Sequence, residues 1–149
     1  MVGAGSAIPG ISSLAKHCRH FVAVNLQPRT GPLIPNVSCV VFDSVADAFV
    51  EKLKHGMAAW KHGDPREAGV KVGPLINRRA AEHVQGLVDD AVRNGAKLLG
   101  GGKSHVCYVE PTLLDNVPLA ARIAFEETFG PVATVMRFKD EAEALQVSA

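Results

Sequence analysis

The stretch Glu126-Glu127-Thr128-Phe129-Gly130-Pro131-Val132 stands directly before an apolar run that continues to Met136. Two carboxylates and an aromatic ring are followed by a Gly-Pro pair, in which glycine tolerates unusual backbone angles and proline fixes φ. Such a bend can hold a carboxylate and a ring rigidly at one end of a buried strand. The pattern predicts a strand from Val132 to Phe138, and before it a site for a ligand that has a hydroxyl-bearing part and a flat part.

Upstream of this strand, apolar residues that recur every four positions predict a helix from Val45 to about Trp60. Asp43 or Ser44 would cap its start, because a short polar side chain can accept a backbone hydrogen bond there. Gly63-Asp64-Pro65 would end it. The expected buried stripe consists of Val45, Phe49, Leu53 and Met57.

Two further helices are expected. The first runs from about Arg79 to Asn94, and Asn94-Gly95 is a favourable C-terminal cap because glycine adopts the left-handed conformation cheaply. Asp140 can cap the second, which starts at Glu141 and is still running at Ala149, so we expect the chain to be part of a longer domain. The apolar face of the first helix would consist of Ala80, Val84, Leu87, Val88 and Ala91.

Short strands alternate with these helices, which implies an α/β architecture with a largely parallel sheet. A hairpin turn is expected at Gly100-Gly101-Gly102. The strands are predicted at Phe21–Val24, Lys97–Leu99, Val106–Val109 and Thr112–Leu114.

Composition excludes several classes of function. The 149 residues fit one domain, and a net charge of +1 favours neither nucleic acid nor an anionic membrane as a partner. Three widely spaced cysteines argue against a disulfide framework and a zinc site, and the six scattered histidines suggest no other metal site. No apolar run reaches the roughly 20 residues needed to cross a bilayer, and no secretory pattern opens the chain. We therefore expect a cytoplasmic protein.

Two other runs accompany the Glu126–Val132 stretch, namely Val72-Gly73-Pro74-Leu75-Ile76-Asn77 and Glu110-Pro111-Thr112-Leu113-Leu114. Together the three resemble the C-terminal part of the catalytic domain of NAD(P)-dependent aldehyde dehydrogenases. The resemblance implies a three-layer catalytic domain of that type, incomplete here, with a mostly parallel sheet. It divides the chain into a partial catalytic domain at 42–149 and an irregular segment at 1–41 that does not match the family.

The resemblance also implies a function. The full enzyme would be a homo-oligomer that oxidises a small-molecule aldehyde to a carboxylic acid, with NAD or NADP as cofactor. Glu127 would accept hydrogen bonds from the hydroxyls of the nicotinamide ribose, and Phe129 would pack near the nicotinamide. Salicylaldehyde and vanillin dehydrogenases look somewhat closer than other members, which suggests an aromatic aldehyde. In the alternative interpretation, both glutamates are solvated turn residues and Phe129 belongs to the core.

No catalytic residue can be assigned in this sequence. The family acts through a cysteine thiolate, which attacks the aldehyde carbon and leads to a thioester that water hydrolyses. The resemblance places this cysteine at about Leu33 or Ile34, which cannot act as nucleophiles. Cys39 lies in the apolar run Val37–Phe42, where we expect a buried and inert strand residue. Cys18 and Cys107 match no family position.

The peptide Gln27-Pro28-Arg29-Thr30-Gly31 suggests why the N-terminal segment departs from the family. It can be written CAA-CCA-AGG-ACA-GGN, and the same bases read one position later encode Asn-Gln-Gly-Gln. That run precedes the nucleophile in the family. Our hypothesis is that residues before about Val40 include an out-of-frame translation. A divergent or artificially joined segment is the alternative.

The sequence is also consistent with two rival functions. The chain could be a catalytically inactive fragment or pseudoenzyme that acts only through association, since uncovered apolar faces favour self-association. It could also be a relative of CoA-acylating semialdehyde dehydrogenases. We also expect that this chain alone does not turn over an aldehyde, since its nucleophile cannot be identified.

Overall fold

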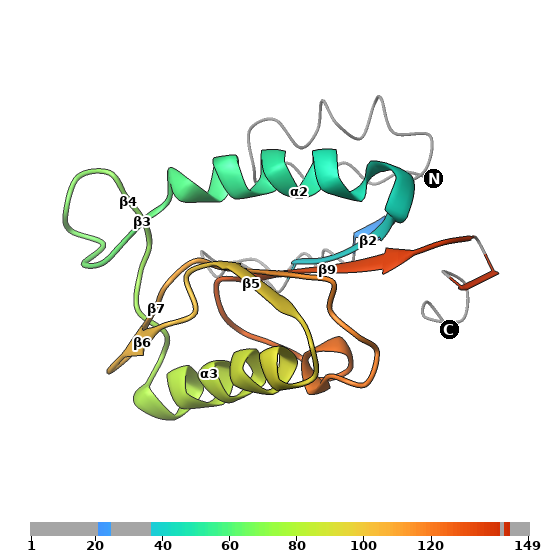
Figure 1. Cartoon of the computed structure of the whole chain (residues 1–149). Helices are drawn as coiled ribbons and strands as arrows, with labels where there is room; N and C mark the ends of the chain where they lie inside the picture. The colour runs from blue at the N-terminus through green and yellow to red at the C-terminus, as the bar shows by residue number, and fades with distance from the viewer. Residues whose placement is uncertain (1–20, 25–36, 141, 144–149) are drawn as a thin grey trace.

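A computed structural model of the chain describes residues 21–24, 37–140 and 142–143, and it has three layers (Figure 1). Helix α2 (Asp43–Ala58) covers one face of a β-sheet, and helix α3 (Arg78–Arg93) covers the other. This arrangement confirms the predicted α/β class.

The sheet has five strands in the order β1-β2-β9-β8-β5. The three central strands β2, β9 and β8 run parallel, whereas β1 and β5 are antiparallel to their neighbours. Val37 lies opposite Ala133, and Thr112 lies opposite Val132, so the N-terminal ends of the central strands meet at one edge of the sheet. The strands span Phe21–Val24 (β1), Val37–Phe42 (β2), Lys97–Gly100 (β5), Thr112–Asp115 (β8) and Val132–Phe138 (β9).

Strand β9 is buried on both faces, as its continuous apolar run predicts. Ala133 and Val135 belong to the core that lies under α2. Val132, Met136 and Phe138 belong to the core under α3. The predicted strand bounds, Val132 to Phe138, are confirmed, and this strand joins the two halves of the hydrophobic core.

Helix α2 begins directly where β2 ends. Phe42, the last residue of β2, occupies the N-cap position in an extended conformation and has no side-chain oxygen with which to cap the helix. The predicted caps at Asp43 and Ser44 are therefore wrong, because both residues already lie in the first turn. The predicted stripe is correct except that Val45 is only partly buried. The buried residues are Ala46, Phe49, Val50, Leu53 and Met57.

Helix α3 begins one residue before its predicted start. The side chain of Asn77 caps it, since Asn77 Oδ1 accepts a hydrogen bond from the Ala80 N–H at 2.8 Å. The predicted end is confirmed, because Asn94 is the C-cap and Gly95 has a φ of 104°. Ala80 is only partly buried, and the buried face consists of Ala81, Val84, Leu87, Val88 and Ala91.

Two small pairs of strands extend the domain beyond the sheet. β3 (Lys61–His62) and β4 (Val70–Val72) pair in parallel, and β6 (Ser104–His105) and β7 (Tyr108–Val109) form a hairpin. Val106, with a φ of 55°, lies in the turn of that hairpin, so the predicted strand Val106–Val109 is wrong in its first half.

The predicted hairpin turn at Gly100-Gly101-Gly102 is also wrong. Gly100 is the last residue of β5, which pairs with β8, and Gly101 and Gly102 lead from it toward β6, which pairs with β7. A Cβ on Gly101 would overlap the carbonyl oxygen of Pro111, so this connection passes very close to a neighbouring segment.

The predicted start of the last helix, with Asp140 as its cap, is present at the end of the described residues. The Glu143 N–H donates to Asp140 Oδ1 at 2.9 Å, and the Lys139 N–H donates to Glu143 Oε2 at 3.0 Å. Reciprocal bonds of this kind resemble a capping box and satisfy N–H groups at a helix start. Residues 142–143 are helical, and the rest of the predicted helix lies outside the described residues.

Candidate functional site

The candidate site lies where the chain enters β9. A 3-10 helix, η1 (Arg122–Ala124), leads into the Glu126–Val132 stretch. Along this stretch the side chains alternate in exposure. Glu127 is exposed, Thr128 is 1% exposed, Phe129 is 52% exposed and Gly130 is buried. The segment therefore presents Glu127 and Phe129 to solvent at the edge where the central strands begin.

The two adjacent glutamates differ in their environment. Arg122 holds Glu126 through two hydrogen bonds, Nε to Oε1 at 2.6 Å and Nη2 to Oε2 at 2.9 Å. The side-chain hydrogen bonds from Arg122 lower the pKa of Glu126 below its ordinary value. Glu126 is thus paired within its own segment.

Glu127 has no hydrogen bond or ion pair through its side chain with any part of the chain that the structure describes. An ionised carboxylate accepts hydrogen bonds at both oxygens, so it can take two hydroxyl donors at once. The alternative interpretation of Phe129 as a core residue is wrong, because half of its surface is exposed. Glu127 therefore offers an open hydrogen-bond acceptor, and Phe129 an exposed flat ring, in the same segment.

Gly130 and Pro131 fix the base of this turn. A Cβ on Gly130 would lie 2.9 Å from Cγ2 of Val84, so only glycine lets the chain pass this close to α3. The carbonyl of Pro131 accepts a hydrogen bond from the Thr112 N–H at 2.8 Å, which joins the turn to β8. The Gly130 carbonyl accepts another from the Val132 N–H at 2.8 Å. The side chains before Gly130 thus project from a firmly held base.

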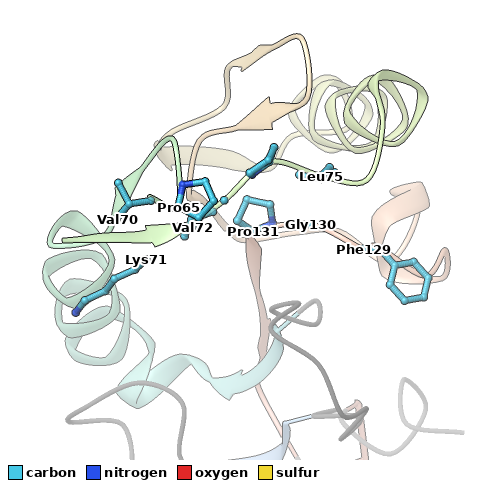
Figure 2. A pocket seen from close by; sticks show the side chains of 10 residues that line it. Pro65, Val70, Lys71, Val72, Leu75, Phe129, Gly130 and Pro131 are labelled. Carbon is cyan, nitrogen blue, oxygen red and sulfur yellow. The ribbon is translucent and has the colours of Figure 1, made fainter. Parts of the chain in front are cut away.

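A largely apolar pocket of about 320 Å³ extends from this turn toward β4. Figure 2 shows Pro65, Val72 and Pro131 close together, Lys71 extending away from them, and the Phe129 ring at the other end of the pocket. The sequence alone did not indicate that the two Gly-Pro pairs, Gly73-Pro74 and Gly130-Pro131, meet in one pocket. The lining residues are Pro65, Val70, Lys71, Val72, Gly73, Pro74, Leu75, Phe129, Gly130 and Pro131.

The two described cysteines, Cys39 and Cys107, differ in their exposure. Cys39 lies in β2 beneath α2, and its side chain is 1% exposed. Burial raises the pKa of its thiol to about 12, so the thiolate is scarcely formed near neutral pH. Cys107 is partly exposed in the turn between β6 and β7. Cys18, Leu33 and Ile34 lie outside the described residues.

Within the described ranges, no group of three or more His, Cys, Asp or Glu side chains could hold a metal ion. Over the same ranges, no helix is long and apolar enough to cross a membrane.

Comparison with known proteins identifies the family. The model of the aldehyde dehydrogenase family matches residues 37–148. The chain is 49% identical over 111 residues to a glutarate-semialdehyde dehydrogenase of Pseudomonas aeruginosa, covering 72% of this chain and 23% of that protein. It is 38% identical over 118 residues to a vanillin dehydrogenase of a Pseudomonas species, covering 79% of this chain and 24% of that protein.

A solved structure gives the same result. The NADP-dependent glyceraldehyde-3-phosphate dehydrogenase of Bacillus halodurans, complexed with NADP, superposes with a TM-score of 0.70 at 43% identity, over 74% of this chain and 23% of that one. This chain therefore belongs to the aldehyde dehydrogenase family, as its sequence motifs predicted. It spans about 23% of the length of these relatives.

The comparisons bear on two finer expectations. The predicted cofactor class, NAD or NADP, agrees with the NADP complex of the Bacillus structure. The family match begins at residue 37, five residues before the boundary predicted at Phe42. The division into 1–41 and 42–149 and the roles of Glu127 and Phe129 stay predictions.

Proposed function

We propose that this chain supplies the nicotinamide-ribose contacts of an aldehyde dehydrogenase that oxidises an aldehyde to a carboxylic acid with NAD(P)+. The observation that carries the proposal is the contrast between the two adjacent glutamates. Arg122 engages Glu126, whereas Glu127 is exposed and unpaired among the described residues. A carboxylate kept open beside an exposed ring suits a ligand with vicinal hydroxyls and a flat heterocycle.

Each residue has a separate role in this proposal. NAD(P)+, when bound, supplies the hydride acceptor for aldehyde oxidation. Glu127 accepts hydrogen bonds from the two hydroxyls of the nicotinamide ribose, and Phe129 packs beside the nicotinamide. Gly130 and Pro131 hold both side chains at the start of β9.

The family's cysteine thioester chemistry requires a nucleophile that Cys39 cannot supply. We propose that the reading-frame hypothesis accounts for this, with Asn-Gln-Gly-Gln and a following cysteine encoded one base out of frame before about Val40. Sequencing the coding DNA and translating it in all three frames tests this. Another frame that gives Asn-Gln-Gly-Gln followed by Cys supports the hypothesis, and its absence from every frame rejects it.

The aldehyde class has two candidates. The sequence motifs suggested an aromatic aldehyde, whereas the Pseudomonas aeruginosa relative, at 49% identity, is named for the semialdehyde of a dicarboxylic acid. We retain the aromatic class as the first proposal and glutarate or succinate semialdehyde as the second, since a relative from Escherichia coli, at 42% identity, is named for succinate semialdehyde. A homo-oligomeric enzyme in the cytoplasm, which the family resemblance and the composition suggested, also remains a proposal.

The ribose contact can be tested on the chain itself with nicotinamide mononucleotide, which carries only the nicotinamide ribose half of the cofactor. Saturation-transfer NMR detects binding even when it is weak, so millimolar dissociation constants are measurable. We expect signal transfer to the nicotinamide and ribose protons in the wild-type chain, and a clear loss in Glu127→Gln and Phe129→Ala. Glu51→Gln is the matched control, because Glu51 is exposed on α2, which covers the opposite face of the sheet from α3.

Two outcomes would reject the proposal. One is the absence of any transfer to the wild-type chain, which would favour a chain that acts only through association. The other is equal transfer in the wild type and Glu127→Gln. In an intact homologue, thioester formation on addition of CoA would favour the CoA-acylating alternative.

A further inference from the structure

Arg122 links three parts of the structure around the candidate site. Its backbone N–H donates to Asp90 Oδ2 on α3 at 2.9 Å. Its carbonyl accepts hydrogen bonds from the N–H groups of Phe125 at 3.0 Å and Glu126 at 2.8 Å. Its guanidinium makes the two bonds to the Glu126 carboxylate described above. The main chain and the side chain of one residue thus organise the whole turn before Glu127.

The bidentate pair of Arg122 and Glu126 fixes the orientation of both side chains as well as the distance between them. Two parallel N–H···O bonds between a planar guanidinium and a carboxylate define the orientation of both groups. The Glu126 side chain is therefore held back along its own turn. The next residue, Glu127, projects outward, and Thr128 after it is buried, with its hydroxyl donating to the Glu126 carbonyl at 3.4 Å.

The pair also sets the charge at the site. Without Arg122, two adjacent carboxylates would stand beside a ligand that itself carries phosphate, and like charges at close range repel. With Arg122 in place, the charge of Glu126 is compensated, and Glu127 is left as the single uncompensated carboxylate of the stretch. Asp90, the other acidic side chain that contacts Arg122, accepts from its backbone N–H, whereas the guanidinium donates to Glu126.

We propose that Arg122 is a positioning residue for the cofactor, which acts through Glu126 to keep the neighbouring Glu127 carboxylate free and directed outward. The inference rests on the proposed function, since it presupposes that Glu127 binds the nicotinamide ribose. Arg122 itself touches no ligand in this arrangement. Its loss leaves Glu126 free to move and to compete with Glu127 at the site.

The binding test uses nicotinamide mononucleotide and the full chain. Arg122→Ala weakens binding about two- to fivefold, the range expected when a partly exposed ion pair is lost. Arg122→Lys keeps the positive charge but cannot donate two parallel hydrogen bonds to the carboxylate, so it gives an affinity between those of the wild type and Arg122→Ala. The double variant Arg122→Glu/Glu126→Arg restores the pair with reversed partners and returns the affinity toward wild type. A loss of packing alone would not be rescued by this exchange.

Arg66→Ala is the matched control. Arg66 also makes a bidentate pair, with both carboxylate oxygens of Asp64, and is highly exposed on the β3–β4 connection. We expect binding to be unchanged in this variant. Thermal unfolding of every variant shows whether the fold is retained.

A second measurement tests the pair without any ligand. Carbon-13 NMR of the glutamate carboxyls follows the titration of Glu126, which faces Arg122, His83 and Asp90. The pKa of Glu126 lies below its ordinary value in the wild type and moves back up in Arg122→Ala. An unchanged titration in Arg122→Ala would overturn the inference.

The outcomes separate the two proposals. If Glu127→Gln weakens binding but Arg122→Ala does not, the positioning role is wrong and the proposed function stands. If Glu127→Gln binds as the wild type does, the proposed function is wrong, and the positioning role is overturned with it. If both variants weaken binding and the exchanged pair restores it, both proposals are supported.

Discussion

Cys39 has its thiol buried in β2 beneath α2, with a pKa raised to about 12. At pH 8 only about one such thiol in ten thousand is ionised, and alkylating reagents attack the thiolate. We expect iodoacetamide to modify Cys107 in the folded chain and Cys39 only after unfolding, as measured by peptide mass spectrometry. Equal rates for the two cysteines would contradict this.

The same pKa gives a pH dependence with a definite sign. Because the thiol pKa is higher in the folded state than its ordinary value of 9.0, its contribution to stability is fully present below pH 9. The contribution is lost as pH rises from 9 toward about 12. A Cys39→Ala variant should therefore lose less stability than the wild type over that range in denaturant titrations.

Gly130 gives a second prediction at the residue scale. In Gly130→Ala the new methyl lies 2.9 Å from Cγ2 of Val84, a side chain that is 1% exposed and cannot easily move. We expect a loss of about 1 to 3 kcal/mol in the free energy of unfolding, measured with urea.

A double-mutant cycle identifies the cause of that loss. In a Val84→Ala background the clash is removed, so Gly130→Ala should cost little there. An equal cost in both backgrounds would mean that the backbone of Gly130, and not its approach to α3, requires glycine.

At the scale of elements, Arg137 on β9 ties the parallel sheet to α2. It donates to both oxygens of Asp115 on β8, at 2.9 and 2.7 Å, and to Asp47 on α2 at 2.8 Å. The Asp115 side chain is 5% exposed, whereas that of Asp47 is 88% exposed. We expect Asp115→Ala to lower the free energy of unfolding by about 2 to 3 kcal/mol, because the Arg137 guanidinium loses the buried carboxylate to which it donates.

Asp47→Ala is the matched control, and it should cost less than about 1 kcal/mol because the pair is solvated. Urea unfolding followed by circular dichroism measures both variants. Equal losses of stability in the two variants would show that the burial of Asp115 does not make its ion pair with Arg137 the stronger one.

The sequence predicted correctly those elements whose bounds depend only on residues adjacent in the chain. The apolar run Val132–Phe138 and the Asn94-Gly95 cap both needed no information from elsewhere in the chain. The start of α2 did not follow from local signals, because β2 leads straight into it and leaves no place for a polar cap. The Gly100–Gly102 connection depends on its approach to Pro111, which only the tertiary structure reveals.

At the scale of the whole molecule, the candidate site could be predicted only in part. The motif identified Glu127 and Phe129 as candidate cofactor contacts, and the structure leaves both exposed. The pocket beside them joins the 70–75 segment to the 129–131 turn, which are distant in sequence. The engagement of Glu126 by Arg122 was missed, although their four-residue spacing is a known signal for an ion pair.

The placement of the cysteines predicts that this chain alone does not oxidise aldehydes. Cys39 is buried and un-ionised, Cys107 lies in the β6–β7 turn, and Cys18, outside the described residues, matches no nucleophile of the family. The test incubates the chain with NAD+ or NADP+ and with benzaldehyde, salicylaldehyde or succinate semialdehyde, and follows absorbance at 340 nm. We expect no rise above a blank without protein. A rise that depends on the cofactor and disappears after alkylation of the thiols would show that one of these three cysteines acts as the nucleophile. Cys→Ser variants would then identify which one, and the reading-frame hypothesis would lose its main support.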